Sequence, residues 1–221
     1  MNQRSASDEQ TLGKQIVERA KTCEIDLDLD RALLLARHMR RVMDAELSLH
    51  LTSIKTADEF LERHIGESLE GAAMLDPDTA GWLLDLGSGN GYPGLPVATC
   101  CGELRPLLAE VSVRKAEFLR AVTDELFPGG RVIDRQIQRA EDLADDPMVS
   151  VIVTRAMGNW ERVLPRLATR ISPGGSLLVW AGEQMESVAG RKAWQRYRLM
   201  GRRALPGRER SWVWHFSLVQ A

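Results

Sequence analysis

The stretch that most constrains the fold is "LLDLGSGNGYPGLP", residues 83–96, in which four glycines and two prolines follow directly on an apolar run. Such a run predicts a buried strand that closes in a tight turn, because glycine reaches the left-handed backbone conformations that tight turns need. Bare backbone amides in such a turn can approach a ligand closely. The stretch therefore predicts a small-molecule site at the end of a strand.

From Trp82 onward, short apolar runs alternate with helix-length segments, which is typical of βαβ units. We expect strands at 82–86, 106–110, 131–135, 149–154 and 175–180, and helices near 95–102, 113–126, 159–170 and 184–196. Residues 197–205 and 211–220 predict two more strands joined directly as a hairpin. The result is a doubly wound, mostly parallel, seven-stranded α/β sheet of the Rossmann-like type. Its antiparallel C-terminal hairpin is typical of methyltransferases that use S-adenosylmethionine (SAM).

The N-terminal third predicts a helical cap. After roughly ten residues that we expect to be disordered, apolar spacing marks helices around 12–20, 29–43 and 56–69. Thr56 and Glu59 form a capping box at the start of the third helix. We therefore divide the chain into a helical extension, 1–78, and a SAM-binding domain, 79–221.

Composition excludes several kinds of site. Three cysteines without ligand spacing and four scattered histidines predict neither a disulfide framework nor a metal site. The net charge of -2 offers no global attraction to nucleic acid, so an RNA partner needs a local patch. Eight Lys or Arg residues between Arg191 and Arg210 provide one, although they also fit a solvated helix and turn. Because no window reaches membrane-spanning length, we expect a cytoplasmic protein without a membrane partner.

Two cofactor classes fit the glycine stretch, since G-x-G-x-G from residue 87 overlaps the G-x-G-x-x-G of dinucleotide enzymes from residue 89. Glu110, about twenty positions on, suits the ribose hydroxyls of either class. Asp85 favours SAM, because a carboxylate attracts a cationic amino group and repels a pyrophosphate. Pro93 and Pro96 lack the amides that cradle phosphate. SAM is favoured, and an NAD-dependent oxidoreductase remains an alternative.

Several stretches carry a resemblance to a known family: "LLDLGSGNGYPGLP", "EVSVRKAEFL" (110–119), "QRAEDL" (138–143), "VTRAMGNW" (153–160) and, upstream, "LTSIKTADEFLERHIGES" (51–68). In this order they resemble the 16S ribosomal RNA guanine-N7 methyltransferases, also called glucose-inhibited division protein B. The resemblance covers about 51–182, and its most diagnostic letters are proline, glycine and proline at 93, 94 and 96. It implies SAM as cofactor and the 16S rRNA of the small ribosomal subunit as substrate. We expect a monomer.

Position by position, the resemblance and the glycine pattern together give two sets of site residues. The expected cofactor site comprises Asp85, Gly87, Ser88, Gly89, Gly91, Tyr92, Glu110, Ala140, Glu141 and Arg155. The expected RNA contacts are Arg114, Lys115, Arg155, Arg202 and Arg203, with Trp160 or Tyr92 as a platform on which the guanine stacks. Taken without the resemblance, Glu141 fits a solvated loop charge, Arg155 an ion-pair partner and Tyr92 a residue packed on Pro93.

The chain also departs from the family pattern. Ala181 stands before Gly182 where the family usually has lysine, which removes a contact to RNA, and Glu67 stands where aspartate is usual. Guanine N7 carries a free lone pair, so we expect no general base. His64, on an apolar stripe, fits a hydrogen-bonded core histidine. A different RNA or small-molecule acceptor, and a SAM-binding regulator without catalysis, remain alternatives.

Overall fold

The structure of the chain is a computed structural model that describes residues 3–155 and 157–219. Seven strands form one sheet in the order β3-β2-β1-β4-β5-β7-β6. Their bounds are β1 Ala80–Leu86, β2 Glu103–Ala109, β3 Arg131–Ile133, β4 Val149–Arg155, β5 Ile171–Gly182, β6 Tyr197–Ala204 and β7 Ser211–Leu218. Strand β7 pairs antiparallel with both β5 and β6, while β1 to β5 pair in parallel. The predicted doubly wound sheet with its terminal hairpin is confirmed.

Helices cover both faces of the sheet. Helices α5 (Gly94–Cys100) and α6 (Val113–Leu126) lie on one face, and α7 (Trp160–Arg166) and α8 (Gln184–Ala189) lie on the other. Three short 3₁₀ turns, at Ala140–Leu143, Ala168–Arg170 and Lys192–Trp194, complete the connections. The expected helix over 184–196 is too long, because the α-helix ends at Ala189 and glycine 190 follows as its C-cap.

The N-terminal third is helical. It comprises α1 (Gln3–Thr22), α2 (Leu29–Leu49), and a continuous helical run in which α3 (Ala57–Phe60), a π-helical turn (Leu61–Gly66) and α4 (Glu67–Ala72) follow one another. The expected ten disordered residues at the start are wrong, because α1 begins at Gln3. Ion pairs from Glu9 to Arg37 and Arg40 of α2 hold the early part of this helix.

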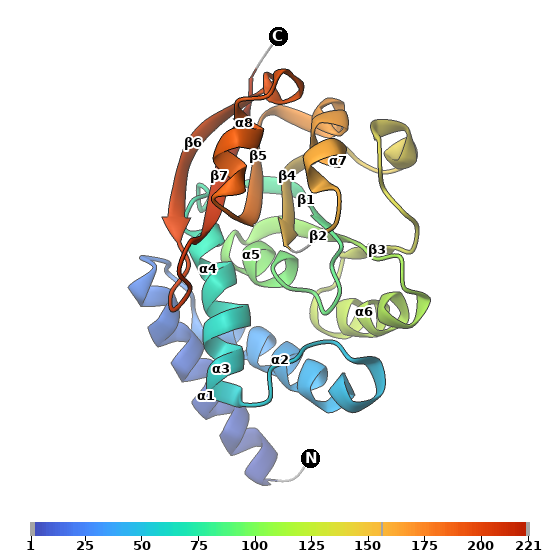
Figure 1. Ribbon diagram of the computed structural model, residues 1–221. Coiled ribbons are helices and arrows are strands. Elements are labelled where there is room, and N and C mark those ends of the chain that lie inside the picture. The colour runs from blue at the N-terminus through green and yellow to red at the C-terminus, as the bar shows by residue number, and fades with distance from the viewer. Residues whose placement is uncertain (1–2, 156, 220–221) are drawn as a thin grey trace.

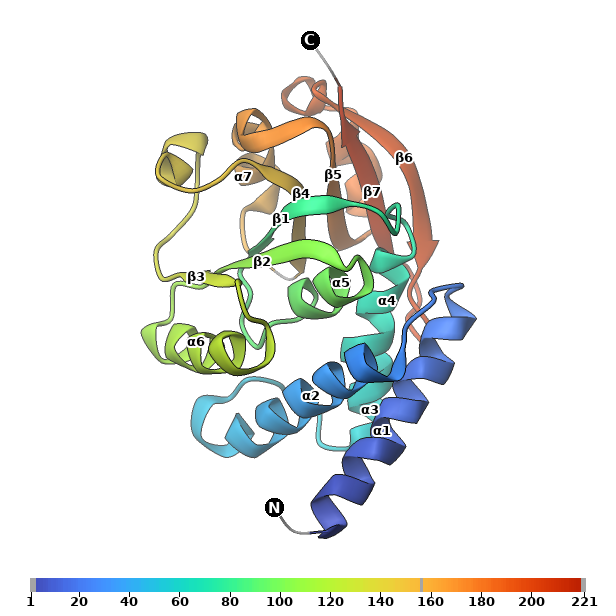
Figure 2. The same cartoon turned by 180° about the vertical axis from the view of Figure 1, so that it is seen from behind.

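The cap and the sheet share one hydrophobic core. Ile16 of α1 and Leu35 of α2 are fully buried in the same cluster as Leu83, Val151 and Val213 of the sheet. Figure 1 shows α1 and α2 gathered at one end of the molecule, with the α3–α4 run leading from them toward the strands, and Figure 2 shows the same grouping from behind. Residues 3–78 therefore pack on the sheet through a core that they share with it; the boundary at 78 stays a prediction.

Parallel pairing places the ends of three strands together. Leu86, the last residue of β1, is in register with Ala109 at the end of β2 and with Thr154 near the end of β4. The chain crosses to opposite sides of β1 at this point, and ligands of open α/β sheets bind at such switch points, beyond the carboxyl ends of the strands. A ligand is therefore expected at the loops after β1, β2 and β4.

Candidate active site

The loop after β1 is a tight turn built on glycine. Gly87, Gly89 and Gly91 have φ angles of +74°, +55° and +90°, which side chains with a Cβ rarely adopt. The amides of Gly87 and Ser88 both donate to the carbonyl oxygen of Ala109 at 3.0 Å. The turn is therefore anchored to the end of β2, beside the next acidic residue.

Glu110 holds this turn through a hydrogen bond to its carboxylate. Its Oε2 accepts a hydrogen bond of 2.9 Å from the Gly89 amide, and its Oε1 accepts one of 2.8 Å from the Ser112 amide. The residue is 8% exposed. Because a carboxylate has about four acceptor positions, both oxygens keep capacity for further donors such as a pair of ribose hydroxyls.

A cavity of about 310 Å³ opens beside Glu110. Apolar side chains supply much of its wall, and the carboxylate of Glu110 and the bare backbone of Gly87 lie at one side. The residues that line it are Leu86, Gly87, Ala109, Glu110, Val111, Arg135, Gln136, Ile137, Gln138, Met157, Gly158, Asn159 and Val163. An apolar slot with one carboxylate at its edge fits a flat base joined to a ribose. We call it the nucleoside cavity.

Asp85 does not line this cavity. It is fully buried behind the loop, where its Oδ2 accepts a hydrogen bond of 2.9 Å from the amide of Gly94, while Oδ1 has no partner among the described residues. Burial raises the pKa of this carboxyl to about 7, against the lowering effect of the Gly94 bond. The structure thus gives Asp85 a part in holding the loop.

Tyr92 lies inside a stack of rings and not at the surface. His38 stacks on it at 4.6 Å between ring centroids and His64 at 5.0 Å, and the tyrosine is 3% exposed. Both histidines come from the N-terminal cap. Because Tyr92 is buried against these rings, the structure does not expose it as a platform for a guanine, in contrast to the expectation.

Arg155 is the last residue of β4, and its guanidinium makes several hydrogen bonds. Its guanidinium donates to Nδ1 of His64 at 2.8 Å, to the Arg63 carbonyl at 3.1 Å and to Glu67 Oε2 at 3.4 Å. Arginine can only donate, so His64 Nδ1 is the acceptor and His64 Nε2–H donates to Thr52 Oγ1 at 2.8 Å. Burial, and then the charge of Arg155, lower the pKa of His64 to about 3. His64 is a neutral, hydrogen-bonded histidine.

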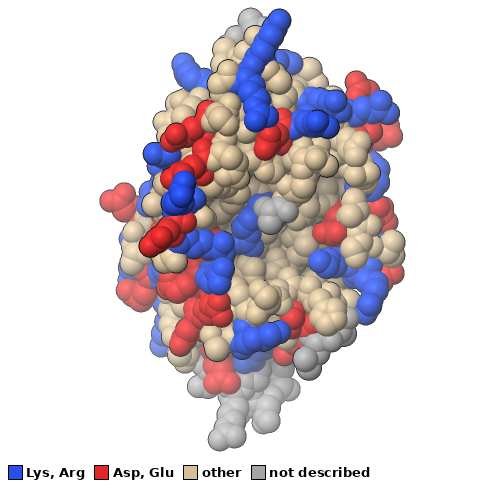
Figure 3. Space-filling model, in the orientation of Figure 1, with Lys and Arg blue, Asp and Glu red and all other residues tan. Residues whose placement is uncertain are grey.

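A second cavity of about 260 Å³ lies on the other side of the segment that follows β4. Its lining comprises Glu67, Arg155, Trp160, Trp180, Ala181, Gly182, Gln184, Leu205, Arg208 and Ser211. Figure 3 shows one face of the molecule, with a hollow near its middle that has mostly tan walls and basic side chains beside it. We refer to the pocket with the lining given above as the second cavity. It contains Ala181, the position where the family pattern has lysine, and Trp160, the other residue expected as a stacking platform.

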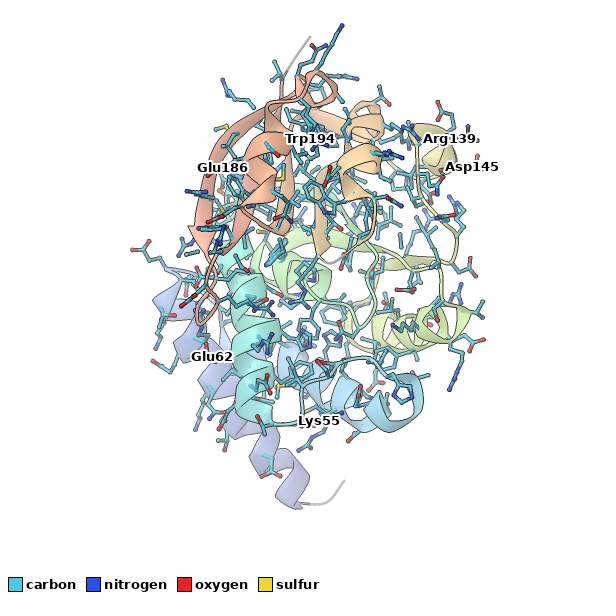
Figure 4. All side chains as sticks on the ribbon, viewed as in Figure 1. Lys55, Glu62, Arg139, Asp145, Glu186 and Trp194 are labelled. Atoms are coloured by element: carbon cyan, nitrogen blue, oxygen red, sulfur yellow. The ribbon has the colours of Figure 1, made fainter. Side chains whose placement is uncertain are left out.

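The remaining expected residues lie further out. Ala140 and Glu141 are in the 3₁₀ turn just beyond Gln138 and do not line the nucleoside cavity, and the Glu141 side chain is 75% exposed. Figure 4 shows Arg139 and Asp145, on either side of this turn, at the outer edge of the molecule. The structure does not bring this pair to the nucleoside cavity.

The basic residues expected at RNA differ in their surroundings. Arg114 and Lys115 lie in the first turn of α6, where Arg114 is exposed and Lys115 half-buried. Arg203 pairs with buried Glu70 at 2.9 Å, and Arg202 pairs with Glu186 at 2.5 Å while its guanidinium lies 4.8 Å from the centroid of a tryptophan ring on β7. The two hairpin arginines are thus engaged within the fold.

Two residues near the site were not among those expected. His38 stacks on Tyr92, and its Nε2–H donates to the Asn90 carbonyl at 2.8 Å; no sequence pattern marks it. Glu67, which is 1% exposed, was noted only as a departure from the family pattern. Within residues 3–155 and 157–219, no group of three His, Cys, Asp or Glu could hold a metal ion, and no helix is long and apolar enough to cross a membrane.

Comparison with known proteins matches this architecture. The family described as rRNA small subunit methyltransferase G (GidB) matches residues 32–198. A protein from Sorangium cellulosum (strain So ce56) named ribosomal RNA small subunit methyltransferase G is 30% identical over 181 residues, which cover 80% of this chain and 75% of the relative.

Solved structures with the same fold share much less sequence. Ribosomal protein L11 methylase from Lactobacillus delbrueckii subsp. bulgaricus aligns with a TM-score of 0.55 at 12% identity, over 72% of this chain and 79% of that one. Aeropyrum pernix fibrillarin, in complex with natively bound S-adenosyl-L-methionine, aligns with a TM-score of 0.52 at 16% identity, over 67% of this chain and 73% of that one. These alignments establish the methyltransferase fold.

Proposed function

Because this chain belongs to the rRNA small subunit methyltransferase G family, we propose that it is a SAM-dependent methyltransferase that modifies N7 of a guanine in the 16S rRNA of the small ribosomal subunit. The observation that carries the proposal is the nucleoside cavity, where Glu110 and the glycine turn meet at the switch point of the sheet. The same family membership supports a role in rRNA methylation and, with it, SAM as the cofactor.

The residues present fit SAM. The two oxygens of Glu110 have acceptor capacity left for ribose hydroxyls, and Ile137, Val163 and the other apolar side chains of the cavity suit the adenine. When bound, SAM supplies an electrophilic methyl group on a sulfonium sulfur. Gly87, Gly89 and Gly91 leave bare backbone where the methionine part would lie. The start of α5 does not suit a pyrophosphate, since Pro93 has no amide to donate and the Gly94 amide is bound to the carboxylate of Asp85.

The protein's contribution to the reaction is then positional. Guanine N7 carries a free lone pair that would accept the methyl group while the C–S bonding electrons remain on sulfur, so no residue of the protein would have to remove a proton beforehand. The histidines nearest to the site agree with this. His64 is held neutral by burial and by Arg155, and fully buried His38 has its pKa lowered to about 4. Neither histidine faces an open site where it could act as a base. The protein would therefore accelerate the reaction by aligning the guanine with the methyl group and by excluding water.

The decisive experiment uses small ribosomal subunits that lack the modification. Incubation with methyl-labelled SAM should label the 16S rRNA, and strand scission specific for 7-methylguanine should then cut it at a single position. Label that stays resistant to this scission would point to a different acceptor atom. Calorimetric titration completes the test, because the protein should bind SAM and show no heat with NAD.

A further inference from the structure

The second cavity has the chemistry of a base-binding site. It adjoins the nucleoside cavity through the segment 155–160, since Met157 and Asn159 line the first cavity while Arg155 and Trp160 line the second. Substrate and cofactor would therefore meet across this segment. What the second cavity could recognise follows from its most buried charged residue.

That residue is Glu67, at the first position of α4. Its Oε2 accepts from Arg155 at 3.4 Å, and its Oε1 lies 2.5 Å from Nε of Arg208 without the alignment of a hydrogen bond. The side chain of Glu67 is 1% exposed. A buried carboxylate with acceptor positions left over calls for donors, because an unsatisfied buried polar group costs free energy.

Among the RNA bases, guanine presents two N–H donors side by side, at N1 and at the exocyclic amine, which match the two oxygens of a carboxylate. Adenine has an acceptor at N1 and repels a carboxylate there. Trp160 adds an aromatic ring to the lining of the same cavity, and aromatic side chains stack on bases that leave an RNA helix.

In the structure, Arg208 forms an ion pair with Glu67. It lies in the turn between β6 and β7, its side chain is 38% exposed, and its charge offsets that of Glu67. A long, partly exposed side chain can reach a phosphate of the incoming RNA, and N–H donors of a bound base would then replace it on the carboxylate. Arg155, held at the same time by His64 and the Arg63 carbonyl, stays in place.

We propose that the second cavity binds the base of the acceptor guanosine, with the carboxylate of Glu67 accepting hydrogen bonds from N1–H and from the exocyclic amine. This inference rests on the proposed function and names the group that selects its substrate. Recognition through this edge leaves N7, which belongs to the other ring of the purine, available to the methyl group.

The first test measures methyl transfer to unmodified small subunits by the wild type, Glu67→Gln and a control, Glu62→Gln. Glu62 lies on the same helical run with its side chain 56% exposed, 3.6 Å from Arg19 of α1 and outside the lining of the second cavity, and Figure 4 labels it beside that run. Glu67→Gln should lose roughly tenfold or more in kcat/KM for the subunit and keep its SAM affinity, while Glu62→Gln keeps both. A folded Glu67→Gln protein with unchanged kcat/KM would overturn the inference.

The second test needs no variant, and so it decides the question even if Glu67→Gln does not fold. At saturating SAM, GMP, IMP and AMP are compared as inhibitors competitive with the subunit. GMP offers both donors, IMP only N1–H and AMP neither, so inhibition should weaken in that order, by roughly tenfold per lost hydrogen bond. AMP equal to GMP, or no inhibition by any of the three, counts against the inference. Failure of the wild type to methylate subunits at all would instead refute the proposed function.

Discussion

Arg155 donates a hydrogen bond of 2.8 Å from its Nη2 to Nδ1 of His64, and this contact joins the end of β4 to the π-helical turn of the cap. A π-helical turn inserts an extra residue into a helix and is common at functional sites. Here it places a histidine ring on Tyr92 and aims one ring nitrogen at the guanidinium. The cap and the loop after β1 are thereby fixed to the same arginine.

Replacing His64 by phenylalanine keeps a ring against Tyr92 but removes the acceptor. The buried guanidinium of Arg155 then loses a partner, so the free energy of unfolding should fall by about 1–3 kcal/mol. Urea denaturation measures this. The control is His50→Asn, at an exposed position with φ +48° that asparagine tolerates, and it should change little. Equal stabilities for the wild type and His64→Phe would contradict the role given to this bond.

His38 makes stability depend on pH. Its pKa is lowered to about 4 by burial, so the native protein keeps it neutral where the unfolded chain, with a pKa near 6.5, takes up a proton. Between these values the unfolded state binds more protons, and stability falls as the pH falls, by about 1.4 kcal/mol per pH unit for this group. His38→Phe should remove that share of the slope in urea denaturation series from pH 7.5 down to 4.5. A variant with the wild-type slope would show that another group titrates.

Gly94 has no room for a side chain. A Cβ at this position would lie 2.5 Å from Asp85 Oδ2 and 2.7 Å from Asp85 Cβ. Gly94→Ala should therefore destabilise the protein by about 1–3 kcal/mol and weaken SAM binding, since the loop after β1 has to shift. Gly201→Ala is the matched control, because nothing lies within 4 Å of the added carbon. Thermal unfolding and calorimetry together follow both effects.

Variants of Glu110 and Glu141 distinguish two possible positions for the ribose contact, at the end of β2 or at the 3₁₀ turn. Glu110→Gln should weaken SAM binding roughly tenfold, through the loss of a charged acceptor for the ribose. Glu141→Gln should leave the affinity unchanged, because its exposed side chain lies outside the nucleoside cavity. Calorimetric dissociation constants for the two proteins are sufficient. The opposite ranking would move the ribose contact to the 3₁₀ turn.

Elements that are stabilised by contacts within their own segment could be predicted from the sequence pattern of that segment. The expected helix at 113–126 matches α6 residue for residue, since its apolar spacing is determined within the segment. Thr56 caps α3 as expected, accepting a hydrogen bond of 3.2 Å from the Glu59 amide. The third strand, in contrast, ends at Ile133 and not at 135, because strand length depends on how far the neighbouring strand offers partners.

Contacts between distant parts of the chain explain what could not be predicted. The stack of His38, Tyr92 and His64 joins three segments, and no periodicity in any one of them indicates that their rings meet. The same holds for Arg208, which reaches Glu67 from the far end of the chain. The glycine turn itself was recognisable because glycine is required by the backbone at that place, whatever packs around it.

The hairpin of β6 and β7 has a consequence for biosynthesis. Its inner strand supplies Val213 to the core that Ile16 and Leu35 of the first two helices also enter, and Arg203 beside it pairs with Glu70 of the cap. A chain without the hairpin still offers Leu83 and Val151 to these helices, but it lacks Val213 and leaves Glu70 without Arg203. A protein shortened before β7 should therefore expose part of its core and become a target for chaperones and proteases.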